Sequence, residues 1–311
     1  MIPIPTKKKL IVLVMSIIFF IFAGQTTFSE KKGNSRLRLS LKLAAGPGYI
    51  RVGDINNHIQ SFDDYMSASL VFYQGGKMER ISNYIPHFEG ELRIDFNPKL
   101  AIAVGTGYIS GSKSSDFQTA GIFPFSSTRW DPALFEYIIE PEIKAIPLKV
   151  GIYYSIPLTS NIDFLMQGGI GYYFSKAYLL KKNIIRSLYE FSIPEYPQIV
   201  NEYEVSGSSP GLHGGIGLEY KLTNAFFLVI DVQGRYAKIT KLSGTRAHFN
   251  TWNSDQNQDN GILYIGTRNL TDEGYGDNCP DLLISPSLNM DKASLDLSGF
   301  YLTIGLKIRL F

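Results

Sequence analysis

The side chains of this sequence best suited to proton transfer are its histidines, because histidine titrates near neutral pH. Four are present, at positions His58, His87, His213 and His248. His87 and His213 fall near the same ends of predicted strands, where Ser110, Asp116 and Ser175 could gather. A histidine beside a serine and an acid can activate the hydroxyl for acyl transfer or hydrolysis. Since no spacing forces these residues together, we expect His87 and His213 to bond to loops or neighbouring charges, and we predict no catalytic residue.

Metal and redox chemistry have little support in the residue pattern. The histidines lack the spacing of a metal-ligand set, and the polar stretch 257–261 lacks the ordered ligands of a calcium loop. Cys279 is the only cysteine of the chain, which excludes a disulfide framework and CxxC motifs. We therefore expect no bound metal and no cofactor.

The first residues have the three parts of a secretory signal. Lysines at 7–9 precede an uncharged apolar run over 10–23, which is short for a bilayer span, and small and polar residues follow. We assign residues 1–29 to a signal peptide and 36–311 to one folded domain. The 30 basic residues are dispersed among 28 acidic ones, so the chain has no basic stripe that would bind nucleic acid.

Strict alternation of apolar and polar residues is the main structural signal. In the last segment, Phe300, Leu302 and Ile304 alternate with Tyr301 and Thr303. Such alternation predicts a strand with one apolar face, and about ten residues cross a bilayer at a tilt. The eight alternating segments are 36–43, 87–96, 100–108, 146–156, 162–174, 212–222, 226–236 and 298–311.

The connections between these segments fall into two classes. Short turns at 97–99, 157–161 and 223–224 follow the second, fourth and sixth segments. Long polar stretches, which we interpret as loops, follow the others at 53–86, 111–144, 178–210 and 239–294. Short periplasmic turns and long extracellular loops are typical of an outer-membrane barrel. The fold class predicted is all-β: an eight-stranded antiparallel up-and-down transmembrane β-barrel, whose last strand closes against its first.

Aromatic residues on the apolar faces fit this topology, because they are predicted to form two girdles at the membrane interfaces. The girdle near the periplasmic rim would contain Phe96, Tyr154, Phe164, Tyr220 and Phe226, and the outer one Phe88, Tyr108, Tyr172, Phe174, Tyr236 and Phe300.

On these segments, from about Arg36 to Phe311, the chain resembles the small eight-stranded outer-membrane β-barrels of Gram-negative bacteria, the class of the OmpA transmembrane domain, OmpX and the opacity-type adhesins. The resemblance implies a monomer in the cell outer membrane, with membrane lipid and the barrel-insertion machinery as partners. It also implies that Phe311 is the assembly signal read by that machinery. Phe311 departs from the usual signal, because it shares parity with Arg309 rather than with the outward apolar residues.

The polar faces of the strands predict what fills the barrel. Eight strands leave an interior just wide enough for side chains, so we expect a plug of paired charges rather than a pore. Glu89, Glu91 and Asp95 are expected to pair with basic residues of the first and last strands. The predicted lumen charge network is Arg38, Lys42, Glu89, Glu91, Arg93, Asp95, Lys149, Asp163, Glu219, Asp231, Arg235, Lys307 and Arg309.

The first loop has apolar residues at helical spacing between Ile55 and Tyr73, which predicts an amphipathic helix over the barrel mouth or other loops. The function we expect is structural or surface-binding, with an extracellular ligand or surface partner held by the loops, and no enzymatic activity. Two alternatives stay open: a narrow channel for small or apolar solutes, and a lipid-modifying enzyme at the rim.

Overall fold

The computed structural model describes residues 37–69, 73–126, 129–187, 198–251, 253–268, 279–287 and 290–310. The predicted signal peptide at 1–29 and the terminal Phe311 lie outside these residues. No helix among the described residues is long and apolar enough to cross a membrane.

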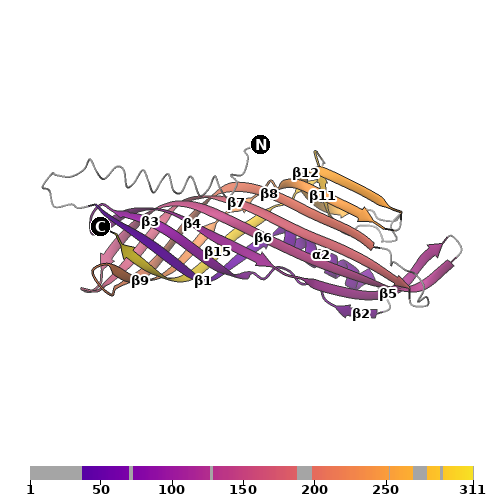
Figure 1. Ribbon diagram of the computed structural model, residues 1–311, viewed down its shortest axis with the longest axis horizontal. Helices are drawn as coiled ribbons and strands as arrows, with labels where there is room; N and C mark the ends of the chain where they lie inside the picture. The colour runs from indigo at the N-terminus through magenta and orange to yellow at the C-terminus, as the bar shows by residue number, and fades with distance from the viewer. Residues whose placement is uncertain are drawn as a thin grey trace. The chain divides into compact units, whose positions relative to one another are not determined.

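Eight antiparallel strands form a closed hydrogen-bonded ring, which confirms the predicted fold class (Figure 1). The closing pair joins the first strand to the last, with a register that runs from Ser40 opposite Arg309 to Gly53 opposite Leu295. Around the ring the strands are β1 (Arg38–Gly53), β3 (Tyr84–Asp95), β4 (Leu100–Ser112), β6 (Arg129–Pro157), β7 (Ile162–Ser187), β8 (Gln198–Lys221), β9 (Phe226–Tyr236) and β15 (Leu295–Arg309).

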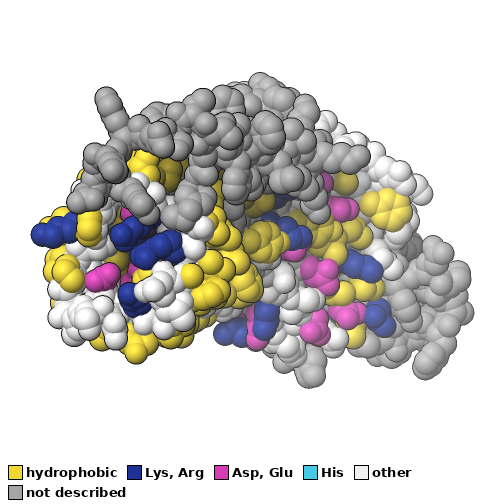
Figure 2. Space-filling model, turned by 60° about the vertical axis from the view of Figure 1, so that its left-hand side comes forward, with side chains coloured by type: hydrophobic (Ala, Val, Ile, Leu, Met, Phe, Trp, Pro, Cys, Tyr) yellow, Lys and Arg dark blue, Asp and Glu magenta, His cyan; other side chains and the backbone are white. Residues whose placement is uncertain are grey.

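The outer wall of the ring is apolar, the reverse of a water-soluble sheet (Figure 2). Ile170 is 65 % exposed and Leu302 43 %, whereas Tyr301 and Thr303, on either side of Leu302, are buried. Hydrocarbon is the solvent that suits such a wall, because its outward side chains are apolar and each strand pairs with a neighbour on both sides of the ring. The wall ends in exposed aromatic residues at both rims: Phe96, Tyr154, Tyr220 and Phe226 at one, and Phe88, Tyr108, Tyr172, Tyr236 and Phe300 at the other.

Three strands continue far past the ring on one side, and here the predicted loops at 111–144 and 178–210 are wrong. β6 has 29 residues, β7 26 and β8 24, and they keep pairing beyond the ends of β4 and β9. Their charged residues suggested loops, but the backbone of each strand stays paired with a neighbouring strand in an antiparallel ladder.

We call this part the extension. It consists of β6 before Pro141, β7 after Ser175, β8 before Gly207 and the smaller elements that join them (Figure 1). These smaller elements are α2 (Asp54–Ser69), β2 (Tyr73–Gly76), β5 (Ser115–Ser126), β10 (Lys238–Ile239), β11 (Ser243–Asn250), β12 (Asp255–Arg268), β13 (Cys279–Ser285) and β14 (Asp291–Lys292).

The predicted amphipathic helix is α2, and it is the helix around which the extension packs. Ile55, Ile59, Phe62 and Met66 are buried in one apolar cluster with residues of the extension and the upper barrel. Asp54 begins the helix, and its carboxylate accepts hydrogen bonds from the backbone N–H and the hydroxyl of Ser294, both at 2.7 Å. The helix ends by Ser69, earlier than expected, so Tyr73 belongs to β2 instead.

Candidate functional site in the barrel lumen

The lumen, the interior of the eight-stranded ring, is filled by polar side chains from all around it. Every second side chain of a strand points inward. The outward positions are apolar and form the wall, and the inward positions between them carry the charged residues. Lys42, Glu89, Arg93, Lys149, Glu219, Asp231 and Lys307 are all buried there.

Glu89 of β3 is the centre of the upper group of ion pairs. Its carboxylate lies 2.8 Å from the Lys42 ammonium and 2.7 Å from that of Lys149, and it accepts a 3.3 Å hydrogen bond from the amide of Gln233. Lys42 also pairs with Asp231 of β9. Two cations and two anions from β1, β3, β6 and β9 therefore compensate one another across the barrel.

Glu219 of β8 is the centre of the lower group. It pairs with Lys307 of β15 and, at 3.4 Å, with the Arg93 guanidinium of β3. Arg93 also binds Asp95 at 2.8 Å and donates to the Ser155 hydroxyl at 3.3 Å. The guanidinium thus distributes its donors over two acids and one hydroxyl, which offsets the cost of its burial.

Two tyrosines complete the network, and sequence reasoning did not include them. The Tyr153 hydroxyl donates to Glu91 at 2.8 Å, and that of Tyr301 donates to Gln233. Lys149 donates to the Tyr301 hydroxyl at 3.2 Å. Alternation places both tyrosines on the inward face of their strands. The sequence prediction assigned only charged residues to the lumen network, so it left these two out.

Some members of the predicted network have other surroundings. Glu91 bonds to Tyr153 rather than forming an ion pair with β1, and Arg38 is exposed at the end of its strand. Arg235 donates to the backbone carbonyl of Leu297 at 2.7 Å, and Arg309 to that of Asn224 at 3.2 Å. Asp163 is partly exposed beside the lower group.

The two histidines predicted at the rim lie inside the lumen. His87 is 2 % exposed, its Nε2 lies 3.5 Å from Glu89, and its ring centre is 3.9 Å from that of Tyr301. His213 packs beside Gly151, where a Cβ would come within 3.1 Å of its Nε2. Inward glycines thus make the room that these rings occupy.

The serines and the acid considered with these histidines are not gathered around them, and Ser110 of β4 is paired with Lys144 of β6. The Ser175 hydroxyl donates to the Gly207 carbonyl at 3.2 Å, and Asp116 is exposed in β5. His248, in β11, contacts Asn201 at 2.9 Å. Within the described ranges, no three histidine, cysteine or carboxylate side chains are placed to hold a metal ion.

A second buried polar cluster, absent from the sequence predictions, fixes α2 within the extension. The Lys181 ammonium of β7 lies 3.3 Å from His58 Nε2 of α2 and 3.1 Å from Asp281 of β13. Burial, together with the neighbouring Lys181 cation, lowers the pKa of His58 from 6.5 to about 3. Burial alone would raise the pKa of Asp281. The neighbouring Lys181 ammonium, which also donates a hydrogen bond to this carboxylate, lowers the pKa below its usual value. The three residues come from segments far apart in the chain, so no local motif announces them.

This closed ring with apolar outside and paired charges inside defines an integral outer-membrane β-barrel. A model of the outer membrane protein beta-barrel domain matches residues 37–263, and the chain belongs to that family. It is therefore a protein of the outer membrane.

Solved structures of outer-membrane proteins are similar to this chain at low sequence identity. Ail, the attachment invasion locus protein of Yersinia pestis, is 12 % identical over 88 % of this chain and 99 % of its own, with a TM-score of 0.35. OprG from Pseudomonas aeruginosa is 10 % identical over 90 % and 99 %, with a TM-score of 0.36. A major outer membrane protein from Thermus thermophilus is 14 % identical over 88 % and 99 %, with a TM-score of 0.34. A search of curated proteins finds no match.

We predict that Glu89→Ala destabilises the barrel by about 3–5 kcal/mol, because it leaves Lys42 and Lys149 buried without their shared partner. The midpoint of denaturant unfolding in detergent, followed by heat-modifiable gel mobility, measures this change. Glu204→Gln is the matched control, since the Glu204–Lys176 pair lies exposed on the extension and its loss is expected to leave the midpoint unchanged. Equal midpoints for all three proteins would contradict the plug.

A second prediction concerns pH. The pKa of His58 is near 3 in the folded extension and 6.5 in an unfolded one, so an unfolded chain binds the proton first. The free energy of unfolding of the extension should therefore fall as the pH is lowered from 6.5 towards 3. Urea titrations at several pH values, followed by the circular-dichroism signal of α2, should show this slope, and His58→Gln should reduce it. Above about pH 7 the two proteins should have the same pH dependence, and a slope unaffected by the substitution would refute the assignment.

Proposed function

We propose that this protein is a sealed barrel that holds the extension at the cell surface as a binding platform. In this proposal the lumen conducts no solute and the protein catalyses no reaction. The single observation that carries it is the continuity of packed side chains along the barrel axis, from the lower charge group around Glu219 to the apolar cluster around α2.

The upper lumen supports the seal, because the polar network and the apolar cluster meet there. Tyr173 belongs to the apolar cluster that contains α2, and its ring lies against Gly171 and Gly211 of the barrel wall. Just below, Tyr301 contacts both His87 and Lys149. A solute would have to displace buried ion pairs and then a hydrophobic core, each of which is costly.

The fixed position of α2 supports the platform. Besides Asp54 and the Lys181 cluster, the Asn56 amide both donates to and accepts from the backbone of Ile81, at 3.0 Å each. Asp63 accepts from the backbone N–H of Met78 at 3.1 Å. These contacts join the helix to the segment between β2 and β3, so the extension is a rigid scaffold of the kind on which recognition surfaces are built.

The outer face of the extension supports recognition rather than further packing. Figure 2 shows acidic and basic side chains interspersed on the side of the molecule that it presents. Glu202, Glu204 and Lys176 are exposed on β8 and β7. Tyr178 lies between them, and burial together with a hydrogen bond to Glu202 raises its pKa. We propose that an extracellular partner binds this mixed polar face.

The position of His87 supports the absence of catalysis, because its ring is buried against Glu89 and Tyr301. His213 is partly buried, and its ring lies beside Gly151 and Gly169. We further propose that the protein is a monomer and is inserted by the barrel-assembly machinery.

The seal is tested by conductance in planar bilayers. We expect no unitary currents from the wild-type protein, because the lumen charges fill the barrel. Replacing α2 by a short Gly-Ser linker should leave the bilayer insulating, since the charge groups below it remain in place. Combining that replacement with Glu89→Ala and Tyr301→Ala should produce leak currents. Resolved channel events from the wild type would instead favour the narrow channel.

The location of the platform is tested by labelling single cysteines on intact cells, in a Cys279→Ser background. Gln258→Cys, exposed on β12, should react with a membrane-impermeant maleimide. Thr159→Cys, in the turn between β6 and β7, should react after the outer membrane is permeabilised and not before. The opposite result would place the extension in the periplasm and end the proposal of a surface platform.

A further inference from the structure

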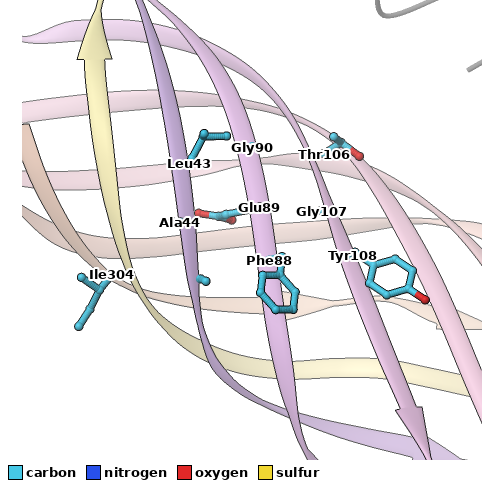
Figure 3. A pocket seen from close by; sticks show the side chains of 10 residues that line it. Leu43, Ala44, Phe88, Glu89, Gly90, Thr106, Gly107, Tyr108 and Ile304 are labelled. Carbon is cyan, nitrogen blue, oxygen red and sulfur yellow. The ribbon is translucent and has the colours of Figure 1, made fainter. Parts of the chain in front are cut away.

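A groove is present on the outside of the barrel wall, on the face turned to lipid (Figure 3). Its volume is about 630 Å³. It runs over β1, β3 and β4 with β15 at its side, and the outward side chains that line it are Leu43, Ala45, Phe88, Thr106, Tyr108 and Ile304, with Gly90 in the floor.

The groove exists because three small outward residues, Ala45, Gly90 and Thr106, are neighbours on adjacent strands. Gly90 pairs with Leu43 on one side and Thr106 on the other, and in the next row Ala45 pairs with Phe88. Larger residues surround this floor, so the wall is indented there. One row lower, Leu41, Leu92 and Val104 face outward from the same strands and fill the wall.

The lining of the groove is apolar in its chemistry. The Thr106 hydroxyl donates to the Pro147 carbonyl at 2.9 Å, so it offers its methyl group without an unsatisfied donor. The Glu89 carboxylate lies on the lumen side of the wall, bound to Lys42 and Lys149, and contributes backbone to the groove (Figure 3). An occupant therefore meets methyl groups, backbone and the rings of Phe88 and Tyr108.

The position of the groove identifies the kind of occupant. It lies within the lipid-facing band, at the level where the outer aromatic girdle begins. Above it, Tyr49 stacks on Phe300 at 5.4 Å and contacts Tyr84 edge-on at 5.5 Å, and Tyr84 is 71 % exposed. Tyrosines with free edges of this kind sit at the height of lipid head groups.

We propose that this groove is a binding site for one acyl chain of a lipid in the adjacent leaflet. The chain lies between Phe88 and Tyr108 with Gly90 beneath it, and its ester end reaches the level of Tyr49 and Tyr84. Water does not fill an indentation in hydrocarbon, and a chain seated there gains dispersion contacts on three sides rather than one. The lipid is held by shape, so its head group is not specified by these contacts.

Photo-crosslinking tests the site. The full-length mature protein is placed in vesicles of phosphatidylcholine that carry a diazirine on one acyl chain, and the crosslinked peptides are mapped by mass spectrometry. We expect crosslinks concentrated on peptides of β1, β3 and β4 that contain Ala45, Phe88 and Tyr108.

Gly90→Ile is the informative variant, because it fills the floor with an apolar strand-forming residue. A Cβ at Gly90 would meet only Leu43 Cδ2, at an ordinary 3.4 Å, so the strand can accept it. Gly168→Ile is the matched control: Gly168 also faces lipid, from β7, and a Cβ there would lie 4.0 Å from its nearest neighbour. Unchanged heat-modifiable mobility of both variants shows that the barrel is intact.

The proposal predicts that Gly90→Ile lowers crosslinking of these peptides to the level of the other strands, while Gly168→Ile leaves it high. Uniform crosslinking around the wild-type barrel would overturn it, as would a pattern that Gly90→Ile does not alter. Protein-to-protein crosslinks across the groove would assign it to a second copy of the chain. Complete displacement of the crosslinkable lipid by free fatty acid at low concentration would identify a soluble ligand. Either of these last two results would also overturn the proposal.

Discussion

Backbone hydrogen bonding in hydrocarbon is the constraint on which the rest of this structure depends. An amide left unpaired inside a bilayer has no water to bind, so the sheet must close on itself. The pairing of β1 with β15 provides that closure. Once the ring is closed, the alternation of side chains along each strand determines which residues face lipid and which face the narrow interior.

The interior then has to accept side chains that cannot be left charged and alone. The two groups centred on Glu89 and Glu219 solve this by sharing each acid between cations of different strands. Sharing links strands that are distant in sequence, so the groups also fix how the wall is arranged around them. Such networks are weak evidence for stability as a whole, but each member becomes costly to remove once its partners are buried.

Much of this could be predicted from alternation alone. The eight membrane strands, the inward set of charges and the exposed girdle aromatics follow from period two, and α2 follows from the spacing of Ile55, Ile59, Phe62 and Met66. Alternation does not report how far a strand continues once it leaves the lipid, because both faces there become mixed in character. This is why β6, β7 and β8 were expected to give way to loops.

The exact partners inside the lumen could not be predicted either. Alternation predicts that the side chains of Glu91 and Arg235 point inward. Their contacts depend on the stagger between neighbouring strands, which alternation does not give. In the structure Glu91 accepts a hydrogen bond from Tyr153, and Arg235 donates one to the Leu297 carbonyl.

The length of β6 has a consequence for what the protein can reach. A strand rises by about 3.3 Å per residue, so its 29 residues extend over roughly 95 Å of chain. A tilted crossing of the hydrocarbon uses about ten of them. About two thirds of the strand therefore continues beyond the hydrocarbon, and in the proposed orientation its far end stands well clear of the lipid surface.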